Sequence, residues 1–507
     1  MRVGLVLGDQ LFALEHFINL KCERIFMAED YELCSRFKCH KLKLVFFIAA
    51  MRSYCSEIRS AGYIVDYIEL SDSKNEDNYT HQNNSSYEEK LTYWIQKNNV
   101  SEFCHFEIAD SFFGTRISNL FKQLAVSQIV LPSPMFLDTT DSITDWMAKQ
   151  KRPFLKSYYE KARIKSQILM LKIAGKLEPV GGQFSFDEAN RLAIPKGLIP
   201  PPLPTNQSSE LLGRVINLVE NLFSSHPGST AQVWIPVTRI EARQWLSDFF
   251  LNRFAQFGPY EDALSNVTPF LYHTAFSPLL NSGLLSPQEV LEAIFQQTKE
   301  HEIPLNSLEG LVRQIIGWRE FIRGIYLVFE HKQNTKNYFN HHRKLAPCWW
   351  NASTGLLHLD RAIQKSIDFG YCHHIERLMV IGNVMLLCEI NPIQAHAWFM
   401  QMFVDSADWV MGPNVFGMAL FSDGGIFATK PYICGSNYWL KMSGDKKEPW
   451  CDDLDSLYWS FVNKHRDLLL KNPRMSMMVK VFDKIKPERK EFLLENAEIV
   501  KNRISFF

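Results

Sequence analysis

The sequence predicts an N-terminal α/β domain with a doubly wound parallel sheet, followed by a large all-α domain. Short apolar segments alternate with amphipathic ones over residues 1–135, which is the pattern of strands and helices in such a sheet. Helical periodicity dominates the later part of the chain, with proline and glycine between the long segments. Because 507 residues are too many for a single core, we expect domains at 1–135 and 236–507 and a linker at 136–235.

Apolar segments recur in the N-terminal region in a regular order. The first, 3–8, is predicted to be a buried strand that ends in a loop at Gly8, and 63–70 is predicted to be another strand. Further apolar segments lie at 42–51, 104–108 and 128–131. Parallel sheets bind ligands outside the carboxyl ends of their strands, so a ligand of this domain is expected there. The polar segment 71–89 is predicted to be an exposed loop.

Composition narrows the class of protein. The 55 basic residues equal the 55 acidic ones, so any contact with nucleic acid must come from a local basic face. The apolar runs are too short to span a bilayer, and the N-terminus begins directly with an apolar, strand-like segment. Ten scattered cysteines indicate reduced thiols, so we expect a cytoplasmic protein that does not contact a membrane. We also expect a monomer.

The predicted linker contains a basic segment and a proline-rich one. Basic and aromatic side chains alternate between residues 147 and 165, which suits a phosphate backbone with stacked bases. A charge run of this kind is more often a solvated helix face. The candidate DNA contacts on this segment are Lys156, Lys161 and Arg163. The proline-rich stretch 195–204 is predicted to be an extended connector at the surface.

Residues 371–438 combine a helical apolar pattern with many polar side chains. The polar groups set into this pattern are His373, His374, Arg377, Asn383, Asp405, Asp408 and Asn414. Buried polar groups must find partners or cost a few kcal/mol each. The pattern therefore indicates either a large, ring-shaped guest that forms hydrogen bonds or a helical core whose polar groups satisfy one another.

Ordered motifs in this part of the chain resemble the cryptochrome/photolyase family. They are WREF at 318–321, HHIERLM–GN from residue 373, W–D–W–PN–GM from residue 398, and the DGG and TKPY segments that follow. The resemblance extends from GDQL at 8–11 to LYW at 457–459, and within the family it is strongest to the bacterial iron–sulfur (6-4) photolyases and cryptochromes. It implies the photolyase fold, FAD as cofactor, UV-damaged DNA as partner and light-driven repair of (6-4) photoproducts. A cryptochrome-like blue-light photoreceptor without repair is the alternative, and a family member without flavin is a third.

The resemblance also assigns residues to the flavin. Segment 272–287 matches the family's phosphate-binding segment, in which hydroxyls at a helix start hold phosphate, although serine and threonine also serve there as N-caps. Asp405 is implied to accept a hydrogen bond from the flavin ring, and Met411 stands where relatives with a carboxylate have Glu. The expected FAD-binding residues are Tyr272, His273, Thr274, Ser277, Gln314, Trp318, Arg319, Arg377, Asn383, Asp405, Met411, Asn414 and Met418.

The same resemblance implies the catalytic groups. His373 and His374 match the paired histidines of the lesion pocket, where a histidine can supply or hold a proton. Tyr432 and Tyr438 complete that pocket. We predict no metal site, because adjacent histidines on one helix do not face one partner.

Two further expectations concern electron transfer and other cofactors. Trp398 and Trp350 match the tryptophans that relay electrons to the flavin. The family's iron–sulfur cluster needs four thiolates, but His358 stands at the first ligand position and only Cys451 remains near the others. We therefore predict that the cluster is absent. Segment 27–43 matches the region of a ribityllumazine antenna and keeps basic side chains, with an empty cleft as the alternative; these are His40, Lys41 and Lys43.

Overall fold

A five-stranded parallel sheet forms the N-terminal region in the computed structural model, which describes residues 1–22, 24–71, 85–195, 197–204, 209–266 and 268–507. The strand order is β3-β2-β1-β4-β5, with β1 at the centre and every pairing parallel. The predicted doubly wound sheet is therefore confirmed. The strands are β1 (Arg2–Leu5), β2 (Arg24–Ala28), β3 (Ile64–Ile68), β4 (Glu102–Phe106) and β5 (Ser127–Leu131).

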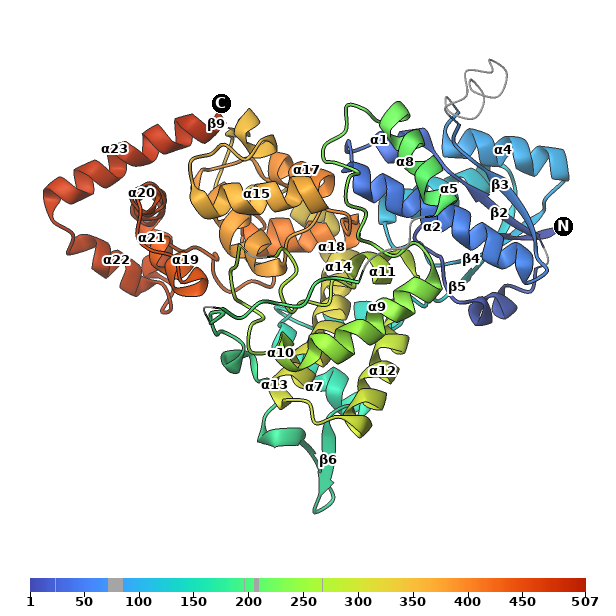
Figure 1. Ribbon diagram of the computed structural model, residues 1–507, viewed down its shortest axis with the longest axis horizontal. Helices are drawn as coiled ribbons and strands as arrows, with labels where there is room; N and C mark the ends of the chain where they lie inside the picture. Colours follow the sequence, from blue (N-terminus) through green and yellow to red (C-terminus); the bar gives the residue numbers. More distant parts are fainter. Residues whose placement is uncertain (23, 72–84, 196, 205–208, 267) are drawn as a thin grey trace.

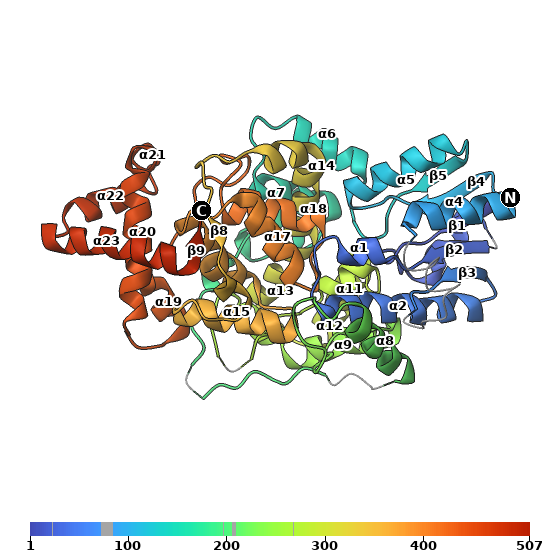
Figure 2. The same ribbon diagram turned by 90° about the horizontal axis from the view of Figure 1, so that it is seen from above.

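Helices cover both faces of this sheet (Figures 1 and 2). On one face, Val3, Leu5 and Phe103 pack with the apolar sides of α4 and α5. On the other, Ile25 and Met27 pack with α2. Strands buried on both faces must be apolar throughout, which explains the continuous apolar runs in the sequence. The helices of this region are η1 (Leu14–Leu20), α1 (Tyr31–Ser35), α2 (Lys41–Ser60), α4 (Tyr87–Asn98) and α5 (Ser111–Gln123).

Two details of the sequence interpretation change. The apolar run 42–51 forms the first half of α2, and the strand before it is the five-residue β2, which the sequence analysis did not single out. A short apolar run fits a buried helix as well as a strand, so periodicity cannot separate them. In the predicted loop 71–89, residues 72–84 lie outside the described residues. Its last residues already belong to α4, where Ser86 and Glu89 form a capping box.

The predicted linker contributes to both regions. Its first helices pack on the helical part, α6 against α14 and α7 against η4, whereas α8 returns to pack on α2. The hairpin of β6 and β7 projects from the rest of the chain (Figure 1). Residue 196 of the predicted connector is not described. The elements are α6 (Thr140–Ala148), α7 (Leu155–Ser166), β6 (Met170–Ile173), β7 (Lys176–Pro179), η2 (Val180–Gly182), η3 (Asp187–Ala189) and α8 (Glu210–Leu222).

The remainder of the described chain is almost entirely helical, as predicted. One short pair, β8 (Lys344–Leu345) with β9 (Ser505–Phe506), ties the C-terminus to the middle of the chain. The helices are α9 (Arg239–Asn252), α10 (Phe254–Phe257), α11 (Ser277–Ser282), α12 (Pro287–Glu300), α13 (Leu305–Val312), η4 (Arg313–Arg319), α14 (Glu320–Thr335), η5 (Pro347–Trp350), α15 (Leu357–Phe369), η6 (Glu376–Gly382), α16 (Asn383–Leu387), α17 (Pro392–Met402), α18 (Asp408–Gly412), η7 (Pro413–Ala419), α19 (Ser436–Ser443), α20 (Trp450–Lys464), α21 (Arg466–Leu470), α22 (Ser476–Asp483) and α23 (Pro487–Ile504).

The two regions share one continuous hydrophobic cluster that runs from the sheet through α2 to α9 and α14. Polar contacts join the carboxyl end of β4 to the helical region. Trp409 donates its backbone N–H to Asp110 Oδ1 at 3.0 Å, and the hydroxyl of Tyr326 accepts a hydrogen bond from the backbone N–H of Ser111 at 2.9 Å. The strand ends at which a parallel sheet usually binds ligands thus face the helical region.

All ten cysteines are free thiols in the structure. Within the described residues, none of the helices combines the length and the apolar character that a membrane-spanning segment needs.

Candidate functional site

Three π-helices carry many of the residues that the sequence motifs singled out. Gln314, Trp318 and Arg319 lie on η4, whereas Arg377 lies on η6; Asn414 and Met418 lie on η7. π-Helical turns are rare and frequently occur at functional sites, because the wider turn redirects side chains. η6 and η7 pack against each other, and a Cβ atom added at Gly382 would lie only 2.8 Å from the Cβ of Ala419. This close approach brings the two π-helices together.

Asp405 is the centre of a buried polar network. Its Oδ1 lies 2.9 Å from Nη1 of Arg377, and its Oδ2 accepts a hydrogen bond from the hydroxyl of Ser277 at 2.5 Å. The backbone carbonyl of Asp405 accepts a further bond from Asn281 Nδ2 at 2.9 Å. The guanidinium of Arg377 also lies over the ring of Phe403, with its Cζ 4.0 Å from the centroid. The network therefore joins η6, the loop before α18 and α11.

Arg319 extends this network towards the linker. Its Nη1 donates to Asn281 Oδ1 at 2.7 Å, and its Cζ lies 4.7 Å from the centroid of Trp409. Burial lowers the pKa of Arg319 to about 10. Arg319 is therefore a buried cation and does not face solvent. Asn281, which connects Arg319 with Asp405, was missed in the sequence because nothing in its spacing distinguishes it from a core-helix asparagine.

The loop before α11 holds the residues of the predicted phosphate segment. Leu271 and Ala275 both have left-handed backbone angles, with φ of 47° and 50°, which non-glycine residues adopt mainly where the surroundings impose them. The backbone carbonyl of Thr274 accepts a hydrogen bond from Trp245 Nε1 at 2.9 Å, and Tyr272 is buried. The helix that follows has only six residues, so its dipole is small. A phosphate at this place would be held by hydroxyl groups more than by the helix dipole.

Three histidines meet beside this network. His273 stacks on His373 with ring centroids 4.7 Å apart and an angle of 13°, and His374 lies edge-on to His273 at 5.5 Å. His373 precedes the helix that His374 begins, so the two side chains are not held in the directions of successive helical residues. This corrects the reason for which a shared partner was excluded. Burial lowers the pKa values of His273 and His373 well below the ordinary range.

Acidic side chains lie next to the imidazole rings of His373 and His374. Glu376 Oε2 lies 3.4 Å from His373 Nε2, and Asp262 Oδ1 lies 3.6 Å from His374 Nε2. The imidazole of His374 is 49% exposed. Burial alone would lower the pKa of His374, but the hydrogen bond to Asp262 and the charge of Glu261 outweigh it and raise the pKa. The surroundings therefore shift the pKa values of these two neighbouring histidines in opposite directions.

Tyr432 and Tyr438 are both partly buried on the segment around α19. Burial raises the pKa values of both phenols; Asp187 adds to the rise at Tyr432 and Asp262 to the rise at Tyr438. Asp262 thus raises the pKa values of both Tyr438 and His374, so these two side chains lie near one carboxylate.

Several predicted flavin residues have their polar atoms satisfied within the chain. Asn383 donates to the carbonyl of Cys434 at 3.1 Å and accepts from its N–H at 3.0 Å, so it clamps that backbone. Asn414 Nδ2 donates to the carbonyl of Val410 at 2.7 Å, and Gln314 Nε2 donates to Glu261 Oε1 at 2.8 Å. Met411 is buried. For these side chains the polar groups satisfy one another, which is one of the two alternatives that the sequence left open.

The two predicted relay tryptophans differ in burial. Trp398 is buried, whereas Trp350 is 38% exposed and donates its Nε1–H to Gln401 Oε1 at 3.3 Å. Trp349 lies next to Trp398, with ring centroids 6.1 Å apart and a hydrogen bond of 3.0 Å from Trp398 Nε1 to the Trp349 carbonyl. Sequence reasoning missed Trp349 because it is adjacent to the residue that the motif matched.

His358, at the first position of the family's cluster ligands, lies among aromatic rings. Its centroid is 5.2 Å from Trp450 and 5.5 Å from Trp439, and these two tryptophans are themselves 5.7 Å apart. Burial lowers the pKa of His358 to about 4. Within the part of the chain that the structure describes, no group of three cysteines converges on this place.

The predicted DNA contacts fall into two kinds. The side chain of Lys156 is 86% exposed, and Lys161 lies over the ring of Trp146 at 5.7 Å. Arg163 is buried and donates to the backbone carbonyls of Ile168 and Phe184, at 3.2 and 2.8 Å. Its prediction as a DNA contact is corrected, because its guanidinium supports the base of the β6–β7 hairpin.

The basic residues of the predicted antenna region also have partners within the chain. His40 Nε2 lies 2.8 Å from the carbonyl oxygen of Ile367. Lys41 forms an ion pair with Glu220 at 2.6 Å, and Lys43 Nζ donates to the carbonyl of Ser406 at 2.6 Å. They tie α2 to neighbouring elements. An antenna at this place stays a prediction.

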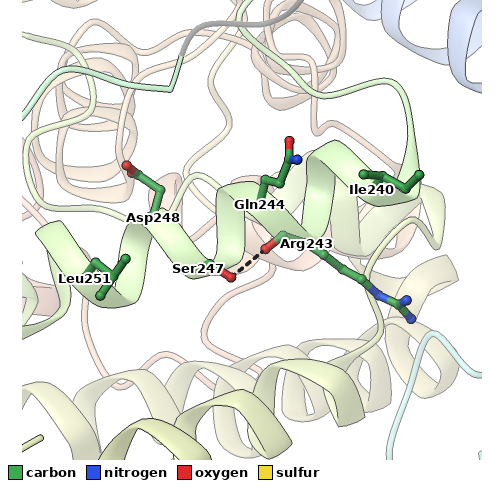
Figure 3. Close-up of a pocket in the computed structure, with 6 residues that line it drawn as sticks. All are labelled: Ile240, Arg243, Gln244, Ser247, Asp248 and Leu251. Atoms are coloured by element: carbon green, nitrogen blue, oxygen red, sulfur yellow. Dashed lines mark hydrogen bonds between the residues drawn. The ribbon is translucent and has the colours of Figure 1, made fainter.

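Two pockets lie away from the histidines. One is a surface groove on α9 lined by side chains of that helix alone, among which Ser247 Oγ donates to the carbonyl of Arg243 at 3.1 Å (Figure 3). The other lies between α5, β5 and α14, where Glu107 pairs with Arg323 at 3.2 Å. Neither pocket brings together the residues that the sequence motifs singled out.

Comparison with known proteins assigns the family. The family described as deoxyribodipyrimidine photo-lyase-related protein matches residues 4–234. A (6-4) photolyase of Agrobacterium fabrum is 32% identical over 485 residues, which cover 93% of each chain. Two solved structures share the fold: an archaeal photolyase from Sulfolobus tokodaii with two FAD molecules (TM-score 0.55, 14% identity, 99% of both chains) and a cryptochrome from Synechocystis (TM-score 0.55, 13% identity, 99% of this chain and 98% of that one). The chain therefore belongs to the cryptochrome/photolyase family and is related over nearly its whole length to a bacterial (6-4) photolyase.

Proposed function

We propose that the chain is a light-driven DNA-repair enzyme, a (6-4) photolyase that uses FAD to revert pyrimidine–pyrimidone (6-4) photoproducts. The observation that carries the proposal is the histidine group next to the Arg377–Asp405 network, in a chain whose relative of 32% identity is named a (6-4) photolyase. A reaction that breaks a bond and moves a proton can use a positioned histidine to give or take that proton.

The residues present fit a flavin. The Arg377–Asp405–Ser277 network offers a carboxylate, a hydroxyl and a fixed cation in an apolar setting. Arg319, which joins this network through Asn281, has a buried Nε without a hydrogen-bond partner, and this N–H can donate to a polar guest. We infer that Asp405 and Arg377 hold the flavin ring, that Ser277 orients Asp405, and that Thr274 holds phosphate.

Reduced FAD, when bound and excited by blue light, supplies the electron for the repair. The chain's own contribution is to position the lesion, exclude water and manage one proton. The hydrogen bond to Asp262 and the charge of Glu261 raise the pKa of His374, whereas burial lowers the pKa of His373 well below its ordinary value. We infer that Nε2 or Nδ1 of His374 carries the proton that the lesion receives, while Tyr432 and Tyr438 line its pocket.

The DNA partner is inferred to bind over Lys156 and Lys161 on α7. Both are on the outer side of a helix that packs on η4. The damaged pair would flip out of the duplex towards the histidines, at a cost of a few kcal/mol. Because phosphate contacts release counterions, substitution of these lysines should weaken binding to any DNA sequence alike.

We propose that the chain lacks the iron–sulfur cluster that the family resemblance implies. Four thiolates are required, whereas His358, Trp439 and Trp450 pack together at the place where the first ligand is expected. Iron analysis of protein purified without oxygen tests this proposal. About four irons per chain would overturn it. A ribityllumazine antenna is a separate proposal, tested by releasing and identifying chromophores other than FAD.

The function is tested with two oligonucleotides, one with a single (6-4) product and one with a cyclobutane dimer. Each is incubated with reduced protein in blue light and in darkness. Repair of the (6-4) strand only in light supports the proposal, and repair of only the dimer keeps a photolyase but changes its substrate. Protein that carries FAD and repairs neither strand would favour the alternative, a blue-light photoreceptor.

A further inference from the structure

One ring nitrogen from each of His273, His373 and His374 lies within 4.8 Å of the others. Among the described residues, no other group of three or more histidine, cysteine or acidic side chains brings its ligand atoms this close together. The three rings come from two separate places in the sequence, the strained loop before α11 and the residues that lead into η6. Tertiary packing, not a local motif, brings them together.

Three ring nitrogens of this group lack hydrogen-bond partners. His273 Nε2 and both nitrogens of His373 are buried without a hydrogen bond, and so is Oε2 of the neighbouring Glu376. Each unsatisfied buried polar group costs about 1–3 kcal/mol. Two of the three histidines are also almost completely buried, so water does not solvate them from outside. A ligand that accepts nitrogen lone pairs, such as a metal ion, would satisfy these atoms.

We propose that these three histidines form a binding site for a soft divalent cation, with Zn²⁺ the best match. Three imidazoles and an open fourth position are the donor set of one type of catalytic zinc site, and imidazole nitrogen suits zinc, copper and nickel more than magnesium or calcium. Zinc–nitrogen bonds of about 2.0–2.1 Å place tetrahedral ligands about 3.3–3.4 Å apart. The rings therefore close around the ion by a rotation of side chains that now stand within 4.8 Å.

Carboxylates near two of the rings support the site. Glu376 Oε2 is 3.4 Å from His373 Nε2, and Asp262 Oδ1 is 3.6 Å from His374 Nε2. Carboxylates in this position orient metal-binding imidazoles and raise their basicity, and the loss of one costs about 10–100-fold in metal affinity. Lys365 in turn holds the other oxygen of Glu376 at 2.5 Å. Glu376 is a positioning residue in this site.

The cation site shares His373 and His374 with the lesion pocket, a point that rests on the proposed function. An ion bound to these rings would compete with the damaged base, so Zn²⁺ would act as an inhibitor of repair. Binding of the metal itself does not depend on light, DNA or turnover. A failure to repair DNA and a failure to bind metal are therefore observed separately.

The test uses the full chain with FAD bound and freed of metal by a chelator. Zn²⁺ is titrated in competition with a chromophoric chelator, and Co²⁺ is followed by its absorption bands at wavelengths longer than those of the flavin. We expect one ion per chain with tetrahedral Co²⁺ bands. His273→Ala should weaken binding by more than about 100-fold, and Glu376→Gln by about 10–100-fold.

The matched control is His301→Ala, an exposed histidine at the end of α12, which should leave the affinity unchanged. His374→Gln, at the half-exposed member of the group, is the second ligand variant in case His273→Ala does not fold; unfolding by denaturant reports folding for each. Absence of stoichiometric binding at micromolar Zn²⁺ overturns the proposal. Binding that survives both ligand variants overturns it as well.

Discussion

Arg377 Nη1 lies 2.9 Å from Asp405 Oδ1, and this ion pair fastens a π-helix to the loop before α18. The side chain of Asp405 is 6% exposed and that of Arg377 is 16% exposed. Each side chain also has another partner. Asp405 accepts a hydrogen bond from the hydroxyl of Ser277, and Arg377 donates one to the carbonyl of Cys372. A pair so placed holds the site in shape before a cofactor enters it.

Arg377→Gln is expected to lower both FAD content and stability. Removal of one partner from a buried pair leaves an uncompensated charge and costs about 3–5 kcal/mol. Flavin absorbance per chain and unfolding by denaturant measure the two effects. Arg361→Gln, which breaks a more exposed pair with Asp445, is the control and should cost at most about 1 kcal/mol. Full FAD content in Arg377→Gln would contradict the assignment.

His374→Ala is expected to reduce the rate of (6-4) repair by about 10²–10⁴-fold, because a general acid is lost. Binding of undamaged DNA should change little, since the phosphate contacts are elsewhere. Single-turnover repair after a light flash measures the first effect and a DNA titration the second. His342→Ala, at an exposed histidine, should leave both values unchanged.

Trp398→Phe is expected to slow the photoreduction of oxidised FAD by an external reductant. Trp398 is buried, and its ring lies 6.1 Å from that of Trp349. Trp349→Phe and Trp350→Phe separate two routes to the surface, one through the buried neighbour and one directly to the exposed ring. Absorbance of the flavin during illumination gives the rate. An unchanged rate in Trp398→Phe would remove this residue from the relay.

Stability is expected to fall as the pH is lowered from about 4.5 towards 2. Burial alone would raise the pKa of Glu389, but hydrogen bonds from Lys464 and Lys501 outweigh it and lower the pKa to about 2. A carboxyl whose pKa is lower in the folded state stabilises the fold above its unfolded pKa, and this contribution is lost as pH falls through the folded value. The free energy of unfolding, measured across this pH range for the wild type and for Glu389→Gln, checks this prediction. The variant should show a shallower dependence on pH.

Trp450→Ala is expected to destabilise the chain by about 3–5 kcal/mol, because a buried aromatic side chain is removed from packing with His358 and Trp439. The flavin spectrum should stay unchanged, since Trp450 is not part of the Asp405 network. Denaturant unfolding and flavin absorbance measure the two. A spectrum that changes with little loss of stability would indicate a role near the flavin instead.

Much of the fold could be predicted from the sequence, because its signals are local. The alternation of apolar and amphipathic segments predicted the parallel sheet, and the helical period predicted the region that follows. Ordered motifs such as WREF and HHIERLM identified the family and placed Arg377 and Asp405 in one site. Short-range patterns are sufficient for such predictions because they report the direction in which neighbouring side chains point.

The sequence by itself thus determined the fold class and the family, and it predicted most of the chemical groups of the candidate site. The tertiary structure alone decided which of them meet. The run 42–51 became a helix because the whole of α2 covers one sheet face, and Arg163 became buried because it donates to the carbonyls of Ile168 and Phe184, which flank the hairpin. His273 joined His373 and His374, and Asn281 connected Arg319 with Asp405, across a hundred residues or more or between separate helices. Burial and partners depend on contacts between distant segments, which no local period in a single sequence encodes.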